Sequence, residues 1–475
     1  MSEYRRQHPL LVLLDTGRGL ISNIGVALVI AVSLPSSTFG GFVGAFIVAL
    51  LALFALSIVY NGLRWRFFFY RYEEGMVHIR QGILFKRERT IRRERVQSIN
   101  VYANVVQQAL GLRTLQIKTA GVGVDAEVNL RAVSKEEAER IRQHLNKEGE
   151  AREGGLEEVA KALRALQGRD LWLAGLTSGR FMALFSVAAV ALSQVIDYIP
   201  QTLIDQALAR ITGVPLLLGL GIVLALFFAT WALSTVVFAL QFANFTVRRF
   251  EDRLELDWGV IKRSHVTVRL HRLQAVVVQQ GLLRQPLGLC TLLVEVAGGG
   301  AKEQEKVSVL YPMLRMREVE GFLRDLLPEY RLPSGATRAP ERARRRYLFR
   351  STVPMALLVA VLLVASYHWN VPYGGAALLL LVPALLLGRS RHSNAKFSID
   401  GDQLTIGFRS LGLYQVLIGR EHVQSLSLLA NPFQRLGRLR TLSISLLSSP
   451  AGKAYALKDL DASDAWAVRE WYSMG

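Results

Sequence analysis

The stretch Arg95-Val96-Gln97-Ser98 decides the fold, because the chain repeats it twice at wide spacing. The other copies are Arg272-Leu273-Gln274-Ala275 and His422-Val423-Gln424-Ser425. In every copy a Thr-Leu pair begins 17 residues after the glutamine, at Thr114, Thr291 and Thr441. A Leu-Gly turn precedes each pair, and its glycine is Gly111, Gly288 or Gly437. A repeat this long can hold its own small core, so the sequence predicts three copies of one domain rather than a solenoid.

Long segments without Asp, Glu, Lys or Arg precede each copy. They cover residues 19–63, 211–247 and 351–388. The first has 45 residues, too many for one membrane-crossing helix of about 20 and enough for two. Turns are expected at Pro35–Gly41 and His368–Gly374, and in the second hairpin a polar stretch, Asp197–Gly213, separates spans at Phe181–Ile196 and Val214–Phe242. The sequence therefore predicts six spans in three hairpins.

Basic residues gather on one side of these hairpins. Arginines flank the first span at 5, 6 and 18, the second at 64, 66 and 71, the third at 180, the fourth at 248, 249 and 253, the fifth at 342, 344, 345, 346 and 350, and the sixth at 389 and 391, with Lys396. The opposite loops carry only Arg210. By the positive-inside rule, both termini and all three soluble units are expected in the cytoplasm. The N-terminal apolar run continues into a second span, which argues against a cleaved signal peptide.

Each soluble unit is predicted to consist of short strands followed by one helix. In the first unit, Met76–Ile79, Val96–Val101 and Thr114–Thr119 are β-rich, and Ser134-Lys135-Glu136-Glu137 has the spacing of a helix capping box. The expected segments are a hairpin at 1–66, a domain at 67–148, a linker at 149–180, a hairpin at 181–245, a domain at 246–330, a basic linker at 331–350, a hairpin at 351–390 and a domain at 391–475. Helical spacing of Leu156, Val159, Ala160, Leu163 and Leu166 predicts an amphipathic helix in the first linker, which lies on the membrane surface or equally packs on the first unit.

The strands, the closing helix, the (Arg/His)-(Val/Leu)-Gln core and the later Leu-Gly…Thr-Leu together resemble the bacterial pleckstrin-homology-like (PH-like) domain, type 2. A hairpin followed by this domain, three times over, is similar to the YdbT group of bacterial membrane proteins. The resemblance runs from about Leu10 to Trp471, and the third copy departs from it by one extra residue between Gly437 and Thr441 and one fewer before Gly437. It implies an α-helical membrane protein with three cytoplasmic α+β PH-like domains in a bacterial inner membrane. It implies no settled activity, and it implies a shorter sibling protein with one hairpin and one domain.

Basic residues in the first two copies are the candidate lipid or partner contacts. They are Lys86, Arg87, Arg89, Arg92, Arg93, Arg95, Lys262, Arg263, Arg269 and Arg272. Eukaryotic PH domains hold phosphoinositide headgroups with basic residues in an early strand–loop–strand. Here the pattern fades along the chain, because Lys86 corresponds to Arg263 but then to Leu413. A solvated charged strand face is the plainer interpretation.

The residues that define the repeat are interpreted as structural. They are Gln97, Gly111, Thr114, Gln274, Gly288, Thr291, Gln424, Gly437 and Thr441. A glutamine kept while the surrounding charges vary suits a side-chain amide bound to a bulge or strand end. The turn glycines suit a positive backbone dihedral or a close approach of another part of the chain. The competing interpretation makes the glutamines binding residues.

The sequence gives little sign of enzyme chemistry. His265 and His271 are the closest histidines and lack metal-ligand spacing, and Gly298-Gly299-Gly300 lacks the ending of a phosphate loop. The single cysteine, Cys290, lies in an apolar run and excludes an internal disulfide. No cofactor or metal is expected.

The formal net charge of +19 is high. No motif interleaves aromatic residues with the arginines as in nucleic-acid binding, so attraction to an anionic leaflet explains the charge better. We therefore expect a non-catalytic inner-membrane scaffold whose PH-like domains bind partners or, weakly, the lipid surface. The alternative is an accessory or core subunit of a transport or export system for a lipid or peptide, although the spans lack buried charges beyond Asp197.

Overall fold

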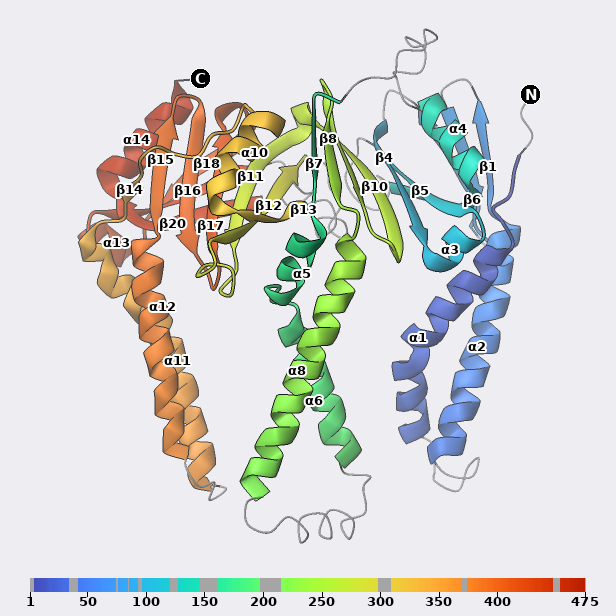
Figure 1. Cartoon of the computed structure of the whole chain (residues 1–475), viewed down its shortest axis with the longest axis horizontal. Coiled ribbons are helices and arrows are strands. Elements are labelled where there is room, and N and C mark those ends of the chain that lie inside the picture. Colours follow the sequence, from blue (N-terminus) through green and yellow to red (C-terminus); the bar gives the residue numbers. More distant parts are fainter. Residues whose placement is uncertain are drawn as a thin grey trace. The chain divides into compact units, whose positions relative to one another are not determined.

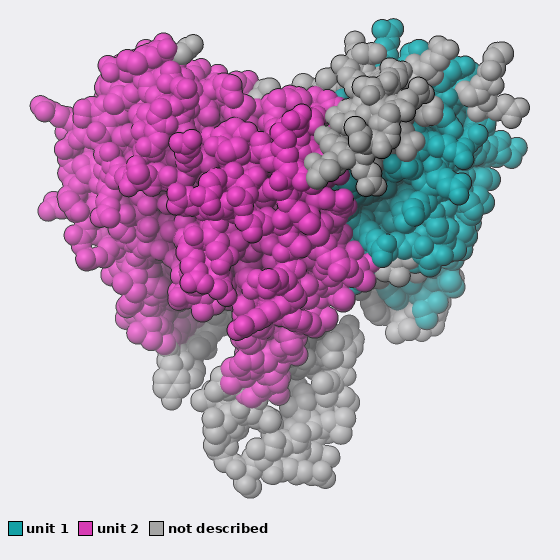
Figure 2. Space-filling view, turned by 45° about the horizontal axis from the view of Figure 1, so that its top comes forward, with its two compact units in different colours: residues 1–159, 261–267 teal, residues 160–260, 268–475 magenta. Residues whose placement is uncertain are grey.

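The structure is a computed structural model that describes residues 4–33, 42–73, 76–83, 85–92, 96–119, 127–145, 160–196, 215–297, 309–368, 374–446 and 453–474. It divides into two compact units, coloured separately in Figure 2. Unit 1 comprises residues 1–159 and 261–267, and unit 2 comprises residues 160–260 and 268–475. Unit 1 holds one hairpin and one PH-like domain, whereas unit 2 holds two of each.

Long apolar helices form the hairpins (Figure 1). Unit 1 contains α1 (Leu10–Ser33) and α2 (Phe42–Arg66). Unit 2 contains α5 (Gly168–Leu176), α6 (Phe181–Ile196), α8 (Pro215–Phe242), α11 (Arg344–His368) and α12 (Leu381–Ser393), the last entered by the 3-10 helix η8 (Gly374–Leu380).

Four helical segments among the described residues are long and apolar enough to cross a membrane. They are Gly44–Arg66, Gly221–Phe242, Glu341–His368 and Gly374–Ser393. The pair α5 and α6, bent by 47°, adds a fifth if it forms one broken span. The 16 residues of α6 reach only about 24 Å at 1.5 Å per residue, less than the hydrocarbon core of about 30 Å. The structure thus supports four or five of the six expected spans.

The domain of unit 1 has two antiparallel sheets and a closing helix. The first sheet contains β1 (Phe69–Glu73), β2 (Met76–Gln81) and β3 (Arg87–Arg92), in that order. The second contains β4 (Val96–Asn104), β5 (Leu112–Thr119) and β6 (Glu127–Ser134), and the short helix α3 (Val105–Ala109) joins β4 to β5. Helix α4 (Lys135–Leu145) closes the domain, with the Glu137 N–H donating to Ser134 Oγ over 3.2 Å as the capping box predicts. Apolar side chains from both sheets and from α4 form one core.

Unit 2 repeats this plan twice. The second domain contains β8 (Thr246–Arg249), β9 (Arg253–Trp258), β11 (Leu273–Gln280), β12 (Leu289–Val296), β13 (Val309–Arg315) and α10 (Val319–Leu326). The third contains β15 (Lys396–Asp400), β16 (Gln403–Arg409), β17 (Leu413–Gly419), β18 (Val423–Leu429), α13 (Pro432–Leu436), β19 (Leu439–Leu446), β20 (Lys453–Asp461) and α14 (Ala462–Ser473).

Strand pairing extends the second sheets of the first two domains. In unit 1, β4 pairs with the start of β10 (Lys262–Arg269), from Lys262↔Asn104 to His265↔Val101. In unit 2, β11 pairs with β17, from Ala275↔Ile418 to Gln280↔Leu413. The second sheet of the third domain has the order β18-β19-β20, so β18 is an end strand among the described residues.

The amphipathic helix expected at residues 156–166 of the first linker is not present over the described part of that stretch, residues 160–166. Residues Ala162–Ala165 instead form β7, which pairs with β8 from Ala162↔Arg249 to Ala165↔Thr246. Leu163 is exposed, so the regular leucine spacing does not mark a buried helix face, and backbone pairing with β8 determines the conformation. Leu156 and Val159 lie outside the described residues. In the linker at 331–350, Thr337–Arg338 forms β14 against β15, and α11 already begins at Arg344.

Candidate functional site

The basic stretch of the first domain lies on β3, the end strand of its sheet. Lys86, Arg87 and Arg92 are exposed, whereas Arg89 is half-buried. Because side chains alternate along a strand, Arg89 shares a face with the buried Ile91. Arg93 and Arg95 lie outside the described residues. The stretch is therefore mainly a solvated strand edge, with one arginine turned inward.

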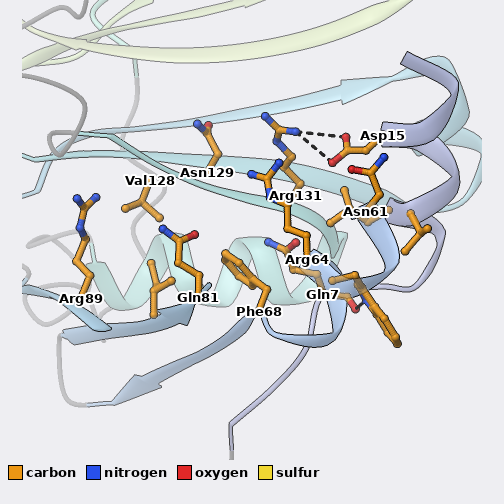
Figure 3. A pocket seen from close by; sticks show the side chains of 14 residues that line it. Gln7, Asp15, Asn61, Arg64, Phe68, Gln81, Arg89, Val128, Asn129 and Arg131 are labelled. Atoms are coloured by element: carbon orange, nitrogen blue, oxygen red, sulfur yellow. Dashed lines mark hydrogen bonds and ion pairs between the residues drawn. The ribbon is translucent and has the colours of Figure 1, made fainter. Parts of the chain in front are cut away.

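Arg89 reaches a pocket of about 170 Å³ between the hairpin and the domain of unit 1 (Figure 3). The polar side chains in its lining come from α1, α2, β2, β3 and β6, and include Asp15, Asn61, Arg64, Gln81, Arg89, Asn129 and Arg131. Arg131 Nη1 lies 3.2 Å from Asp15 Oδ1 and 3.3 Å from Oδ2. Three guanidinium groups and one carboxylate therefore line the pocket, a set suited to an anion.

Sequence reasoning identified Arg89 but assigned neither Arg64 nor Arg131 to a site. Arg64 counted only toward membrane orientation, and no spacing in the repeat singles out Arg131. The corresponding positions in the other domains, read from strand pairing, are Pro312 and Lys458. The arginine pocket thus belongs to the first domain and is not a feature of the repeat.

The other predicted basic residues do not join one site. Lys262 Nζ lies 4.7 Å from the ring centroid of Tyr102, a cation–π contact. Arg263 is exposed. The pKa of Arg113 is lowered first by the burial of Arg113 itself and then by the positive charge of Arg263. Burial, and then the charge of Arg269, lowers the pKa of Arg272. None of these residues lines the pocket described above.

The repeated threonine anchors the turn before it in all three domains. Gln107 Nε2 donates to Thr114 Oγ1 over 3.1 Å, and Gln434 Nε2 donates to Thr441 Oγ1 over 2.9 Å. In the second domain the guanidinium of Arg284 donates to Thr291 Oγ1. Each donor stands seven residues before its threonine. The invariant 17-residue spacing therefore reflects one closed turn between two strands.

The turn needs a residue with positive φ, and two of the three glycines supply it. Gly111 has φ of 68° and Gly288 has φ of 63°. Gly437 does not, because its φ is −88°, and Arg438 takes the left-handed conformation with φ of 50°. The carbonyls of Gly111, Gly288 and Arg438 each accept the first N–H of the region that closes their domain. The extra residue of the third copy thus moves the left-handed position one residue along, so the positive dihedral expected of Gly437 is wrong and belongs to Arg438 instead.

The repeated glutamines stand where each strand pairing shifts register. The shifts lie between Val96 and Ser98, between Leu273 and Ala275, and between Val423 and Ser425. Gln274 is buried, with Nε2 3.5 Å from His422 Nδ1, whereas Gln424 is exposed. A bulge common to the three domains accounts for the repeated position.

The same turns expose two apolar side chains in every domain. The Leu of the Leu-Gly motif is 46%, 58% and 85% exposed at Leu110, Leu287 and Leu436. The residue just before the side chain that donates to the repeated threonine is 50%, 46% and 73% exposed at Val106, Leu283 and Phe433. Figure 1 shows α3 and α13 on the hairpin side of their domains. Each domain thus presents an apolar pair, which we call the turn pair, near the end of its own hairpin.

Polar contacts attach each domain to its hairpin at this level. In unit 1 the contact is Asp15 with Arg131. In the second domain the buried Arg284 donates to Ala174 O over 2.9 Å and to Thr177 Oγ1 over 3.2 Å, and burial lowers its pKa to about 10. In the third, the buried Asp459 faces Arg346 and Arg350 of α11. Three different sets of polar contacts therefore attach the three domains to their hairpins.

The cysteine thiol and the possible metal ligands form no reactive site among the described residues. Burial raises the pKa of the Cys290 thiol to about 12, and its Sγ donates to Leu314 O over 3.3 Å. Within the described ranges, no three His, Cys, Asp or Glu side chains come together as metal ligands.

A hairpin, two sets of three antiparallel strands and a closing helix, repeated along the chain, define a membrane protein built from PH-like domains. The chain belongs to the bacterial PH domain family, whose model matches residues 25–149, 183–330 and 355–474. It is 31% identical over 500 aligned positions to the transmembrane protein YdbT of Bacillus subtilis (strain 168), covering 100% of this chain and 99% of that protein.

Proposed function

We propose that this protein is a non-catalytic scaffold of the bacterial inner membrane whose cytoplasmic PH-like domains rest on the anionic lipid surface. The turn pair carries the proposal, because the same two positions are apolar and exposed in all three domains. A side chain such as Phe433 gains about 1.5–3 kcal/mol when it leaves water completely. Partial immersion of six such side chains would hold the domains against the leaflet.

The distribution of positive charge also supports contact between the first domain and the anionic lipid surface. The basic strand β3 and the arginine pocket both belong to unit 1, and the pocket is lined by Arg64 near the end of α2. Each arginine near an anionic surface contributes about 1 kcal/mol, and salt screens this attraction. Because Asp15 already pairs with Arg131, we propose that the arginines act additively rather than as one headgroup pocket.

Depth-dependent quenching tests the turn pair. Phe433→Cys and Leu436→Cys, each in a Cys290→Ala background, are labelled with the fluorophore NBD in nanodiscs of anionic lipid. Lipids carrying a shallow nitroxide should quench both labels. Trp466→Cys, on the exposed face of α14, is the matched control and should stay unquenched. Equal quenching at all three positions, or none at Phe433, would refute contact through the turn pair.

Single substitutions separate additive charge from a specific pocket. Arg87→Gln, Arg89→Gln and Arg92→Gln in the full-length protein should each reduce co-purified anionic lipid by a similar small amount, with Arg140→Gln on α4 as the control. If Arg89→Gln and Arg64→Gln each caused a dominant loss of co-purified lipid, and lipid binding depended only weakly on salt, the pocket would be a headgroup site instead. Unchanged lipid content in every variant would leave the arginines without a lipid role.

A further inference from the structure

The edge of β18 is the same edge that the other two domains use for strand pairing. Strands β4, β11 and β18 each begin the second sheet of their domain. Strand β4 pairs with β10, and β11 pairs with β17. Strand β18 pairs with β19 on one side and, among the described residues, ends its sheet on the other.

The two existing pairings share one register. Val101, four residues after Gln97, lies opposite His265, nine residues before Gln274. Val278, four residues after Gln274, lies opposite Gln415, nine residues before Gln424. A register kept at both junctions indicates one reusable interface, since a slip by one residue would turn every side chain to the opposite face.

The first domain contains a strand equivalent to the two strands, β10 and β17, that pair at the internal junctions. Strand β3 is the counterpart of β10 and β17, because Ile79↔Arg89 and Ile406↔Val416 occupy matching positions before their glutamines. Strand β3 ends the order of its own sheet in the described part of the chain. The chain therefore carries both halves of an interface that it already forms twice.

The sequence of β18 lacks the usual protection of an end strand. Natural end strands carry charges, prolines or distortions that prevent pairing with another chain. Val423–Leu429 contains no charged residue and no proline, and Leu429 is 59% exposed. Its register shift is shared with β4 and β11, both of which are paired at this edge, so the shift does not block pairing. The basic character of β3 is no obstacle either, since Lys262 and Arg263 of β10 pair with β4.

We propose that β18 pairs with β3 of a second copy of this chain, in the register of the two internal junctions. That register places Leu428 opposite the second copy's Glu88, Leu429 opposite its Arg87 and Gln424 opposite its Arg92. The contact is heterologous, so copies would join head to tail in the membrane plane and form assemblies larger than a dimer. The inference does not require the turn pair to touch lipid.

Cysteine cross-linking in membranes tests both the partner and the register. Two differently tagged full-length copies in the Cys290→Ala background are co-expressed, one with Leu429→Cys and the other with Arg87→Cys. Oxidation should give a disulfide-linked product that carries both tags, because directly opposed residues lie within about 5.5 Å. The matched control replaces Arg87→Cys by Arg92→Cys, which lies about 16 Å further along the strand at 3.3 Å per residue and should not link.

Several outcomes would overturn the proposal. Leu429→Cys copies linking to each other would show two β18 edges meeting. Linkage only to a different protein with its own PH-like domain would make that protein the occupant. If no pair links, the mass of the unmodified protein in detergent is measured by light scattering after size-exclusion chromatography at micromolar concentration. The proposal predicts particles that contain more than two copies of the chain. Particles of a single copy alone would refute self-association.

Discussion

Single positions of the repeat have kept their place in the backbone while their surroundings diverged. Gln274 and Gln424 occupy the same register shift, yet one is buried and the other exposed. The difference follows from β17, which covers β11, whereas no described strand covers the corresponding edge of β18. The repeat therefore provides its own matched comparison of one residue in two environments.

Gln274→Ala should lower the free energy of unfolding by about 1–3 kcal/mol, because a buried polar partner loses its contact and a void remains. Gln424→Ala should change it by less than about 0.5 kcal/mol, as expected for an exposed position. Thermal unfolding of both variants in the same detergent measures the contrast. Equal losses would mean that the bulge, rather than burial, determines the contribution of this glutamine.

His422 lies against Gln274 and makes stability depend on pH. Burial lowers its pKa below the usual value of 6.5, despite the opposing effect of Glu421. The unfolded chain then binds a proton more readily, so the contribution is complete above about pH 6.5 and is lost as the pH falls through that value toward the lower folded pKa. Burial acts on His271 in the same direction.

The midpoint of thermal unfolding should accordingly fall between pH 7.5 and pH 5.5, and His422→Gln should reduce that fall. The comparison is made at constant ionic strength so that charge screening does not change. An identical pH dependence in the variant would place the titrating group elsewhere.

Among the elements, the attachment of α11 to the third domain involves a buried carboxylate. Asp459 is 1% exposed, accepts from Gln434 Nε2 over 2.8 Å and faces two arginines of the helix. Its φ of 57° is a conformation that Asn adopts as readily as Asp. An Asp459→Asn variant therefore removes charge without adding backbone strain.

We expect Asp459→Asn to destabilise the third domain by about 1–3 kcal/mol, less than for a fully buried pair because both arginines remain partly in water. Hydrogen exchange should show faster opening at the start of α11 and in α13, with the first domain unaffected. Glu470→Gln on the exposed face of α14 controls for loss of a negative charge. Uniform loosening throughout the chain would indicate that Asp459 does not act on this attachment alone.

Much of the element pattern could be predicted from the sequence, because hairpins, strands and the capping box at Ser134 leave local signals. The β7 strand could not, since spaced leucines in 156–166 have a helical period and only the nearby β8 edge determines a strand. The arginine pocket was also beyond the sequence, because Arg64, Arg89 and Arg131 come from three elements with no fixed spacing. The shift from Gly437 to Arg438 was visible as an extra residue, although its backbone consequence was not.

For the whole molecule, labelling from outside the cell tests the orientation in the membrane. Single cysteines at Ser37 and Tyr373, with Cys290 replaced, should react with an impermeant maleimide added to intact cells. Cysteines at the exposed Lys135 and Glu470 should react only after lysis. This result follows from the arginine distribution by the positive-inside rule. Labelling of Lys135→Cys in intact cells would reverse the orientation and remove the cytoplasmic leaflet from the proposal.

The shared register between successive domains also has a consequence for biosynthesis. Strand β4 ends at Asn104, and its pairing partner begins at Lys262, so 158 residues must be translated before that edge can be covered. At about 5–20 residues per second, the ribosome leaves the edge open for roughly 8–30 s. The edge of β11 waits almost as long for β17. The first and second nascent domains thus each pass through a period in which a second copy, growing on another ribosome of the same message, could pair with the open edge before the chain's own next domain is made.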